Sequence, residues 1–154
     1  MKGVYVLVIE VPEDRYYDIK AMGGFLFEKG IWLYVGSARG EGSTSLENRI
    51  RRHFRKEKRV HWHIDALLRH PTNLLAAIWA ESTDSMECAV AQSIKGINEV
   101  VPGPKGFGAS DCLNRCTTHL FHTKNREKVQ DLVIEALTKL DLEPRITSDG
   151  AILN

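Results

Sequence analysis

Hydrophobic residues alternate or run together through the first 37 residues and then follow a helical period. The segment 3–11, GVYVLVIEV, is rich in β-branched residues and ends at Pro12, which predicts a strand buried on both faces. Three shorter segments of the same kind follow, RYYDIKAM, GFLFEKG and IWLYVGS, with glycine-containing turns between them. The pattern predicts a four-stranded antiparallel meander.

Helical spacing begins at the segment TSLE. Thr44 and Glu47 fit a capping box, with Thr44 as the N-cap. Leu46, Ile50 and Phe54 then recur every four residues, which predicts a helix with one face in the core.

The rest of the chain alternates between segments with helical spacing and segments with the hydrophobic pattern of a strand. WHIDALLRH predicts a short helix that ends before Pro71, and LLAAIWAES predicts a strand. Thr83 or Ser85 is the expected cap of a further helix that runs to about Ile97. THLFHT predicts a last strand, and NREKVQDLVIEALTKL an amphipathic helix. We therefore expect one α+β domain over residues 1–140, a small antiparallel or mixed sheet flanked by helices, and a C-terminal tail over 141–154.

Composition narrows the class of protein. The chain has 154 residues, of which 43% are hydrophobic and 27% charged, as in soluble globular proteins. No hydrophobic run approaches the roughly 20 residues of a membrane helix, and no signal peptide is recognisable. Three cysteines argue against a disulfide framework. These features predict a cytoplasmic protein without a membrane partner.

Positive charge is concentrated at one place, although the net charge is only +1. Seven cations stand in eleven positions, and one acidic residue, Glu57, interrupts them. Such a run can be a solvated helix face, but like charges at helical spacing repel, and a polyanion would offset that repulsion through counterion release. We interpret the cluster as a nucleic-acid contact, formed by Arg49, Arg51, Arg52, Arg55, Lys56, Lys58 and Arg59.

Four features taken in order resemble the GIY-YIG nuclease superfamily. They are Gly3-Val4-Tyr5 on the first strand, Tyr34-Val35-Gly36 on a later strand, and Arg49 and His53 on the following helix. YVGSA, RRH, HWHIDALL, EC and GFGASDC…THLF resemble a poorly characterised, largely archaeal branch, members of which are sometimes fused to endonuclease-III-type glycosylases. The likeness covers about residues 3–122.

The resemblance implies a metal-dependent endonuclease that hydrolyses phosphodiester bonds in DNA with one divalent ion, Mg²⁺ or Mn²⁺. It implies catalytic roles for Tyr5, Tyr34, Arg49, His53 and Glu87: the tyrosines face the scissile phosphate, Arg49 binds it, and His53 assists by proton transfer or a phosphate contact. Glu87 is the implied metal ligand. His61 matches a second histidine of the family and is a candidate phosphate contact.

The implied roles agree with general chemistry. The planar guanidinium of arginine suits phosphate, and one carboxylate with several waters suits Mg²⁺. Tyrosine, whose ordinary pKa is about 10, is a poor base unless a metal-bound water and Arg49 favour the phenolate. Which tyrosine would be the base stays open.

The sequence departs from the family pattern in two ways. RYYDIKAMGGFLFEKG separates the two short motifs and is interpreted as an inserted hairpin. The family's late asparagine has no clear match, and the nearest residues are Ser110 and Asp111 in GASDC.

Two further groups have metal-ligating residue types. In HWHID we expect His61 to orient or contact phosphate, and His63 and Asp65 to be structural. Cys88, Cys112, Cys116 and His119 have spacings that a structural zinc site permits, but buried thiols that bind no metal are the preferred interpretation.

A DNA endonuclease in repair or in the processing of structured DNA is therefore the leading hypothesis, with a repair protein as a candidate partner. The alternative is a non-catalytic nucleic-acid-binding module that keeps the nuclease fold. A third hypothesis is a zinc-stabilised interaction domain.

Overall fold

The computed structural model describes residues 1–19, 22–69, 71–109 and 116–152. Six antiparallel strands form the main sheet in the order β6-β7-β4-β1-β5-β8. Their bounds are β1 Gly3–Val11, β4 Gly30–Ala38, β5 Asn73–Glu81, β6 Val101–Pro102, β7 Leu120–Thr123 and β8 Arg145–Thr147. Because this sheet is flanked by helices, the α+β fold expected from the sequence is confirmed.

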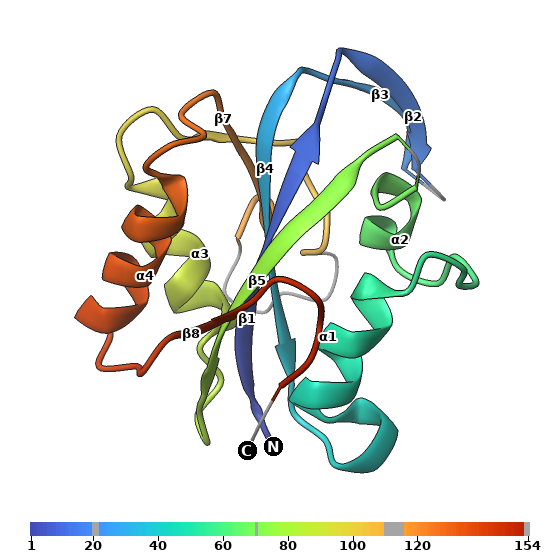
Figure 1. The fold of residues 1–154 in the computed structure, drawn as a ribbon. Helices are drawn as coiled ribbons and strands as arrows, with labels where there is room; N and C mark the ends of the chain where they lie inside the picture. The colour runs from blue at the N-terminus through green and yellow to red at the C-terminus, as the bar shows by residue number, and fades with distance from the viewer. Residues whose placement is uncertain (20–21, 70, 110–115, 153–154) are drawn as a thin grey trace.

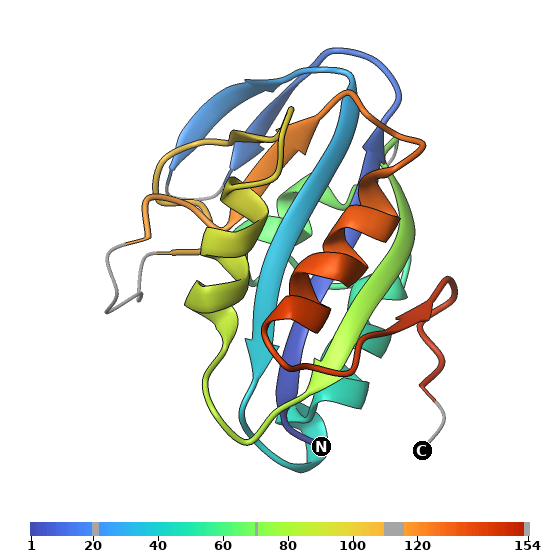
Figure 2. The same cartoon turned by 90° about the vertical axis from the view of Figure 1, so that its left-hand side faces the viewer.

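Helices cover both faces of the sheet. A single turn of 3₁₀ helix, η1 (Gly42–Thr44), leads into α1 (Leu46–Phe54), and α1 and α2 (His63–Leu67) pack on one face. On the other face lie α3 (Glu87–Lys95) and α4 (Val129–Lys139). Figure 1 shows α1 and α2 on the right of the sheet and α3 and α4 on the left, and Figure 2 shows α3 and α4 in front of it.

The alternation within β1 supplies both cores. Tyr5, Leu7 and Ile9 point into the cluster beneath α1 and α2, whereas Val4 and Val6 point into the cluster beneath α3 and α4. Because each residue of a strand faces opposite to the next, one run of hydrophobic residues serves both layers. The prediction of a strand buried on both faces is confirmed.

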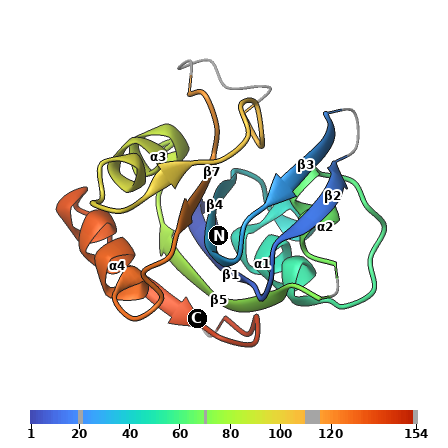
Figure 3. The ribbon, with the colours of Figure 1, turned by 90° about the horizontal axis from the view of Figure 1, so that it is seen from above.

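The predicted four-stranded meander is wrong, because β1 pairs directly with β4. β2 (Arg15–Ile19) and β3 (Gly23–Phe27) instead form a separate two-stranded sheet, which Figure 3 shows beside α2. Tyr17 and Phe27 anchor this hairpin, with their ring centroids 5.6 Å apart and Phe27 packed against Trp32. The inserted hairpin expected between the two short motifs is therefore present.

Helix starts differ from the predicted caps. Residues 42–44 form η1, so the N-cap of α1 moves on to Ser45, whose hydroxyl accepts a hydrogen bond from Asn48 N at 3.3 Å. The Glu47 carboxylate binds the Met1 amino group at 2.6 Å instead of closing a capping box. In α3, the N-cap is Met86 rather than Thr83 or Ser85 and has no side-chain hydrogen bond.

The C-terminal segment belongs to the sheet. Ile146 of β8 pairs with Ile78 of β5, although the sequence from 141 onward predicts only a tail. Three residues with one hydrophobic position are too short for a periodic signal. Within the described part of the chain, the helices are too short and too polar to cross a membrane.

Asp65 fixes the chain between α1 and α2. Its buried carboxylate accepts two hydrogen bonds from the Arg52 guanidinium, both 2.9 Å long, and one each from His61 N and Trp62 N. The Arg52 guanidinium also lies 4.4 Å from the centre of the Trp62 ring. A single carboxylate thus joins the helix to the start of the next helix, and the structural role predicted for Asp65 fits these contacts.

We predict that Asp65→Asn destabilises the protein by about 2–3 kcal/mol, because the half-buried Arg52 charge and two backbone N–H groups lose their partner. Urea unfolding measures this change. Glu57→Gln, at an exposed position, is the control and should change the free energy of unfolding by less than about 0.5 kcal/mol. Equal effects of the two substitutions would contradict this account of Asp65.

Candidate active site

The two tyrosines lie on the same face of adjacent strands. Tyr5 of β1 is opposite Gly36 of β4, and Tyr34 is opposite Leu7. The Tyr5 ring passes over Gly36, where an added Cβ would lie only 2.5 Å from the ring carbon Cζ. The glycine of the YVG segment therefore provides the space that the first tyrosine occupies.

His53 of α1 completes this cluster. Its Nε2 lies 2.8 Å from the Tyr5 hydroxyl, and its ring centroid lies 6.4 Å from that of Tyr34. The side chain is buried, and within the described residues its Nδ1 has no hydrogen-bond partner. Burial, reinforced by the positive charges of Lys58 and Arg52, lowers the pKa of His53 to about 3 against the opposing charge of Asp65, so the imidazole is neutral at physiological pH.

Both tyrosines are neutral as well. Burial is the main cause that raises the pKa of Tyr5 and of Tyr34 above the usual value. The negative charge of Glu87 raises both pKa values further, whereas the positive charge of Arg49 lowers both. The negative charge of Asp65 also raises both pKa values, and Tyr34 raises that of Tyr5.

Ser37 links Arg49 to Glu87. The Arg49 guanidinium donates to the Ser37 carbonyl oxygen at 2.5 Å and lies 5.3 Å from the centre of the Trp62 ring. The Ser37 hydroxyl donates to Glu87 Oε2 at 3.3 Å. Glu87 is on the helix layer opposite α1, so the end of β4 brings together residues from the two faces of the sheet.

All five predicted catalytic residues therefore gather around the ends of β1 and β4. Sequence reasoning gave no role to Ser37 or to Trp62, although each stands inside a segment that carried the family resemblance, YVGSA and HWHIDALL. Their position within these segments was the sequence signal that could have assigned both residues to the site.

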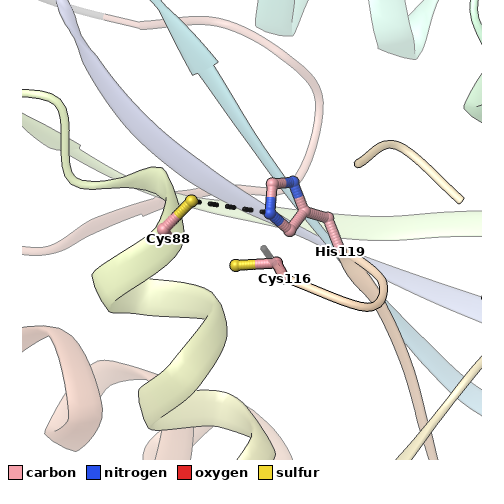
Figure 4. A group of neighbouring side chains, drawn as sticks. All are labelled: Cys88, Cys116 and His119. Carbon is pink, nitrogen blue, oxygen red and sulfur yellow. Dashed lines mark hydrogen bonds between the residues drawn. The ribbon is translucent and has the colours of Figure 1, made fainter. Parts of the chain in front are cut away.

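Glu87 also contacts His119, which precedes β7. Glu87 Oε1 lies 3.4 Å from His119 Nδ1, and Cys88 Sγ lies 3.9 Å from His119 Nε2. Burial lowers the pKa of His119, but hydrogen bonds that its ring donates to Glu87 and Cys116, together with their negative charge, outweigh burial and raise the pKa to about 9. Figure 4 shows Cys88 on the helix facing His119 and Cys116.

The basic cluster is only partly helical. The sequence places Arg55 and Lys56 on a helix face, but α1 ends at Phe54. The Lys58 ammonium donates to the carbonyl oxygens of His53 and Arg55, which are left free where the helix ends. This contact and the repulsion among the cations account for the early end of the helix.

The cations predicted to bind nucleic acid thus fall into two groups. Arg52 and Lys58 are held by contacts within the protein, to Asp65 and to the end of α1. The others are exposed and extend from the last turn of α1 along the loop toward α2: Arg51, Arg55, Lys56, Arg59 and, beside them, His61.

The segment VPGPKGFG borders Tyr34. Phe107 packs edge-on against Tyr34 with ring centroids 6.2 Å apart, and Gly108 N donates to His63 Nδ1 at 3.3 Å. An added Cβ at Gly108 would lie 2.8 Å from the Tyr34 ring, so glycine is required here. Ser110, Asp111 and Cys112 lie outside the described residues.

The buried His53 predicts a pH-dependent stability. Its ordinary pKa of 6.5 applies in the unfolded chain and falls to about 3 in the folded protein, so the unfolded state binds the proton more readily. The stability that neutral His53 contributes is fully present above pH 6.5 and should decrease by up to about 1.4 kcal/mol per pH unit as the pH falls from 6.5 toward 5.

Urea unfolding between pH 7 and pH 5 measures this dependence. His53→Asn should flatten it, and the exposed-residue control His61→Asn should retain it. The same pH dependence in His53→Asn as in the unmodified protein would contradict a neutral, buried His53.

Comparison with known proteins identifies one family. No curated protein and no solved structure matches the chain. A family model described as "Domain of unknown function DUF123" matches residues 4–142, which include the whole candidate site and the helices α1 to α4. The protein therefore belongs to the DUF123 family.

Proposed function

We propose that this protein is a metal-dependent endonuclease of the GIY-YIG type that hydrolyses phosphodiester bonds in DNA. The single observation that supports it most strongly is the convergence of Tyr5, Tyr34, Arg49, His53 and Glu87, which come from four separate elements. A structural role explains one buried tyrosine or one ion pair, but it gives no reason for an arginine, a carboxylate and a tyrosine–histidine pair to meet beside the two central strands of the sheet.

Arg49 is the candidate phosphate ligand. One of its terminal nitrogens binds Ser37, and the guanidinium lies against Trp62, which together hold the side chain in place. Arginine presents several donors in one plane, so further N–H groups can bind phosphoryl oxygens and stabilise the charge that develops on them. Arg49 also lies beside the exposed cations of the loop, which would hold the flanking phosphates.

Glu87 is the candidate ligand for Mg²⁺ or Mn²⁺. Its carboxylate is only partly buried, and among the residues that the structure describes Oε2 makes one long contact, 3.3 Å from the Ser37 hydroxyl, so lone pairs suited to a hard divalent ion are available there. Such an ion, when bound, lowers the pKa of a bound water and neutralises phosphate charge.

Tyr5 is better placed than Tyr34 to take the proton of an attacking water, because only Tyr5 is hydrogen-bonded to His53. In the proposed step, the water oxygen bonds to phosphorus and its proton goes to the Tyr5 oxygen, while the tyrosine proton moves to His53 Nε2. The P–O bond to the leaving oxygen breaks, and the proton held by His53 Nε2 moves to that oxygen. The negative charge of a bound phosphate favours protonated His53 and so opposes the effect of burial.

A panel of DNA substrates tests the activity: supercoiled plasmid, flaps, bubbles, single strands and abasic duplex, with Mg²⁺ or Mn²⁺. We expect cleavage that chelation abolishes and that Glu87→Gln reduces at least a hundredfold, because the substitution removes the ligand charge. Glu135→Gln, on the exposed face of α4, is the matched control. Salt-sensitive binding with no cleavage of any substrate would support the alternative, a nucleic-acid-binding module, and reject the enzyme.

The two groups of cations predict different effects on DNA binding. Arg55 is exposed, so Arg55→Ala should reduce the slope of log K against log salt by about one. Arg52 is occupied by Asp65, so Arg52→Ala should leave the slope unchanged and lower the free energy of unfolding instead. Fluorescence anisotropy over a salt series measures both slopes. Equal changes in slope would show that Arg52 leaves Asp65 to bind phosphate.

A further inference from the structure

A second cluster of metal-ligating residues lies next to the candidate active site. Cys88 is in the first turn of α3, and Cys116 and His119 precede β7, about thirty residues later in the sequence. One ligand atom from each residue lies within 4.8 Å of the others. The three side chains point toward one another, as Figure 4 shows.

The separations suit a tetrahedral ion. With metal–sulfur bonds of about 2.3 Å and metal–nitrogen bonds of about 2.0 Å, adjacent ligand atoms lie roughly 3.5–3.8 Å apart. Cys88 Sγ and His119 Nε2 are 3.9 Å apart. This pair is already at ligand separation, and the distances to Cys116 Sγ, which are at most 4.8 Å, exceed it by about 1 Å or less.

Glu87 supplies the outer contact that metal-binding histidines usually have. Its carboxylate faces His119 Nδ1 at 3.4 Å, while the other ring nitrogen, Nε2, faces Cys88. A carboxylate on Nδ1 fixes the tautomer and orientation of the ring and leaves Nε2 to bind the metal. His119 is buried, so its ring is also held by packing.

We propose that Cys88, Cys116 and His119 Nε2 bind one thiophilic divalent ion, zinc, and that Glu87 orients His119 for this purpose. Two thiolates and an imidazole form a donor set that zinc prefers and that Mg²⁺ avoids. Three protein donors leave the fourth tetrahedral position to water or to a further donor. The loose sequence spacing had favoured buried thiols without metal, but the folded chain brings the three donors together.

The ion would connect the two segments that frame Glu87. It joins the start of α3 to the segment before β7, where the His119 carbonyl oxygen accepts a hydrogen bond from Val35 N at 2.9 Å. Val35 is the neighbour of Tyr34 on β4. Zinc would therefore stabilise the segment that is hydrogen-bonded to β4 beside Tyr34. This inference goes beyond the proposed nuclease activity and does not rest on it.

Metal content tests the site in the full chain without DNA. The protein is purified in the presence of a reductant, freed of metal with a strong chelator, and titrated with Zn²⁺ and with Co²⁺. We expect one ion per chain and, for Co²⁺, the intense near-ultraviolet thiolate charge-transfer band of a sulfur-ligated tetrahedral site. Absence of stoichiometric binding, or a Co²⁺ spectrum without thiolate bands, would overturn the proposal.

Isosteric substitutions identify the ligands. Cys88→Ser and Cys116→Ser should each lower zinc affinity at least a hundredfold, and the control His61→Asn should retain one tightly bound ion. Glu87→Gln should weaken zinc binding about tenfold to a hundredfold without changing the stoichiometry at saturation. Unchanged affinity in both cysteine variants would contradict the site. So would a Cys88–Cys116 disulfide, detected by mass spectrometry, in protein purified in the presence of a reductant.

The zinc and nuclease proposals can fail independently. A protein that binds zinc but cleaves no DNA rejects only the enzyme, and a protein that cleaves with Mg²⁺ but binds no zinc rejects only this site.

Discussion

The Tyr5 hydroxyl meets His53 Nε2 in the interior between the sheet and α1, at a distance of 2.8 Å. This contact is formed only because Gly36, opposite Tyr5 on β4, has no side chain to displace the ring. Burial keeps both partners neutral, so the pair forms without the cost of a buried charge. The positions of β1, β4 and α1 relative to one another, and hence of Tyr34 and Arg49, follow from this packing.

Much of the framework could be predicted from short-range patterns. The two-sided burial of β1 follows from its unbroken hydrophobic run, and the shared face of Arg49 and His53 follows from the helical period. The pairing of the strands that carry Tyr5 and Tyr34 could not be predicted in this way, because the strand pattern placed two further strands between them, and only the family resemblance put both tyrosines at one site.

Contacts between distant segments could not be predicted in this way. Whether β2 and β3 join the sheet or pair with each other depends on packing of Phe27 against Trp32, which periodicity does not encode. The end of α1 at Phe54 depends on the contact of Lys58 with the last carbonyl oxygens of the helix and on the repulsion among the cations. The same holds for the meeting of Glu87, Ser37 and His119, which lie on three different elements or loops.

Glu87 connects the two proposals, because one oxygen faces Ser37 and the other faces His119. A hard ion held by oxygen ligands and a thiophilic ion held by Cys88 and Cys116 differ in the donors that they require, so the sites can coexist on either side of one carboxylate. The first would serve phosphate chemistry, and the second would hold the carboxylate and its helix in position.

The most direct test of the central claim is to measure turnover and DNA affinity in parallel for Arg49→Ala. If Arg49 stabilises charge on a phosphate during cleavage, turnover should fall by a factor of a hundred or more while the dissociation constant rises only a few fold. A protein in which the substitution lowers affinity and the salt slope alone, with no cleavage to lose, would contradict the enzyme and leave a nucleic-acid-binding domain.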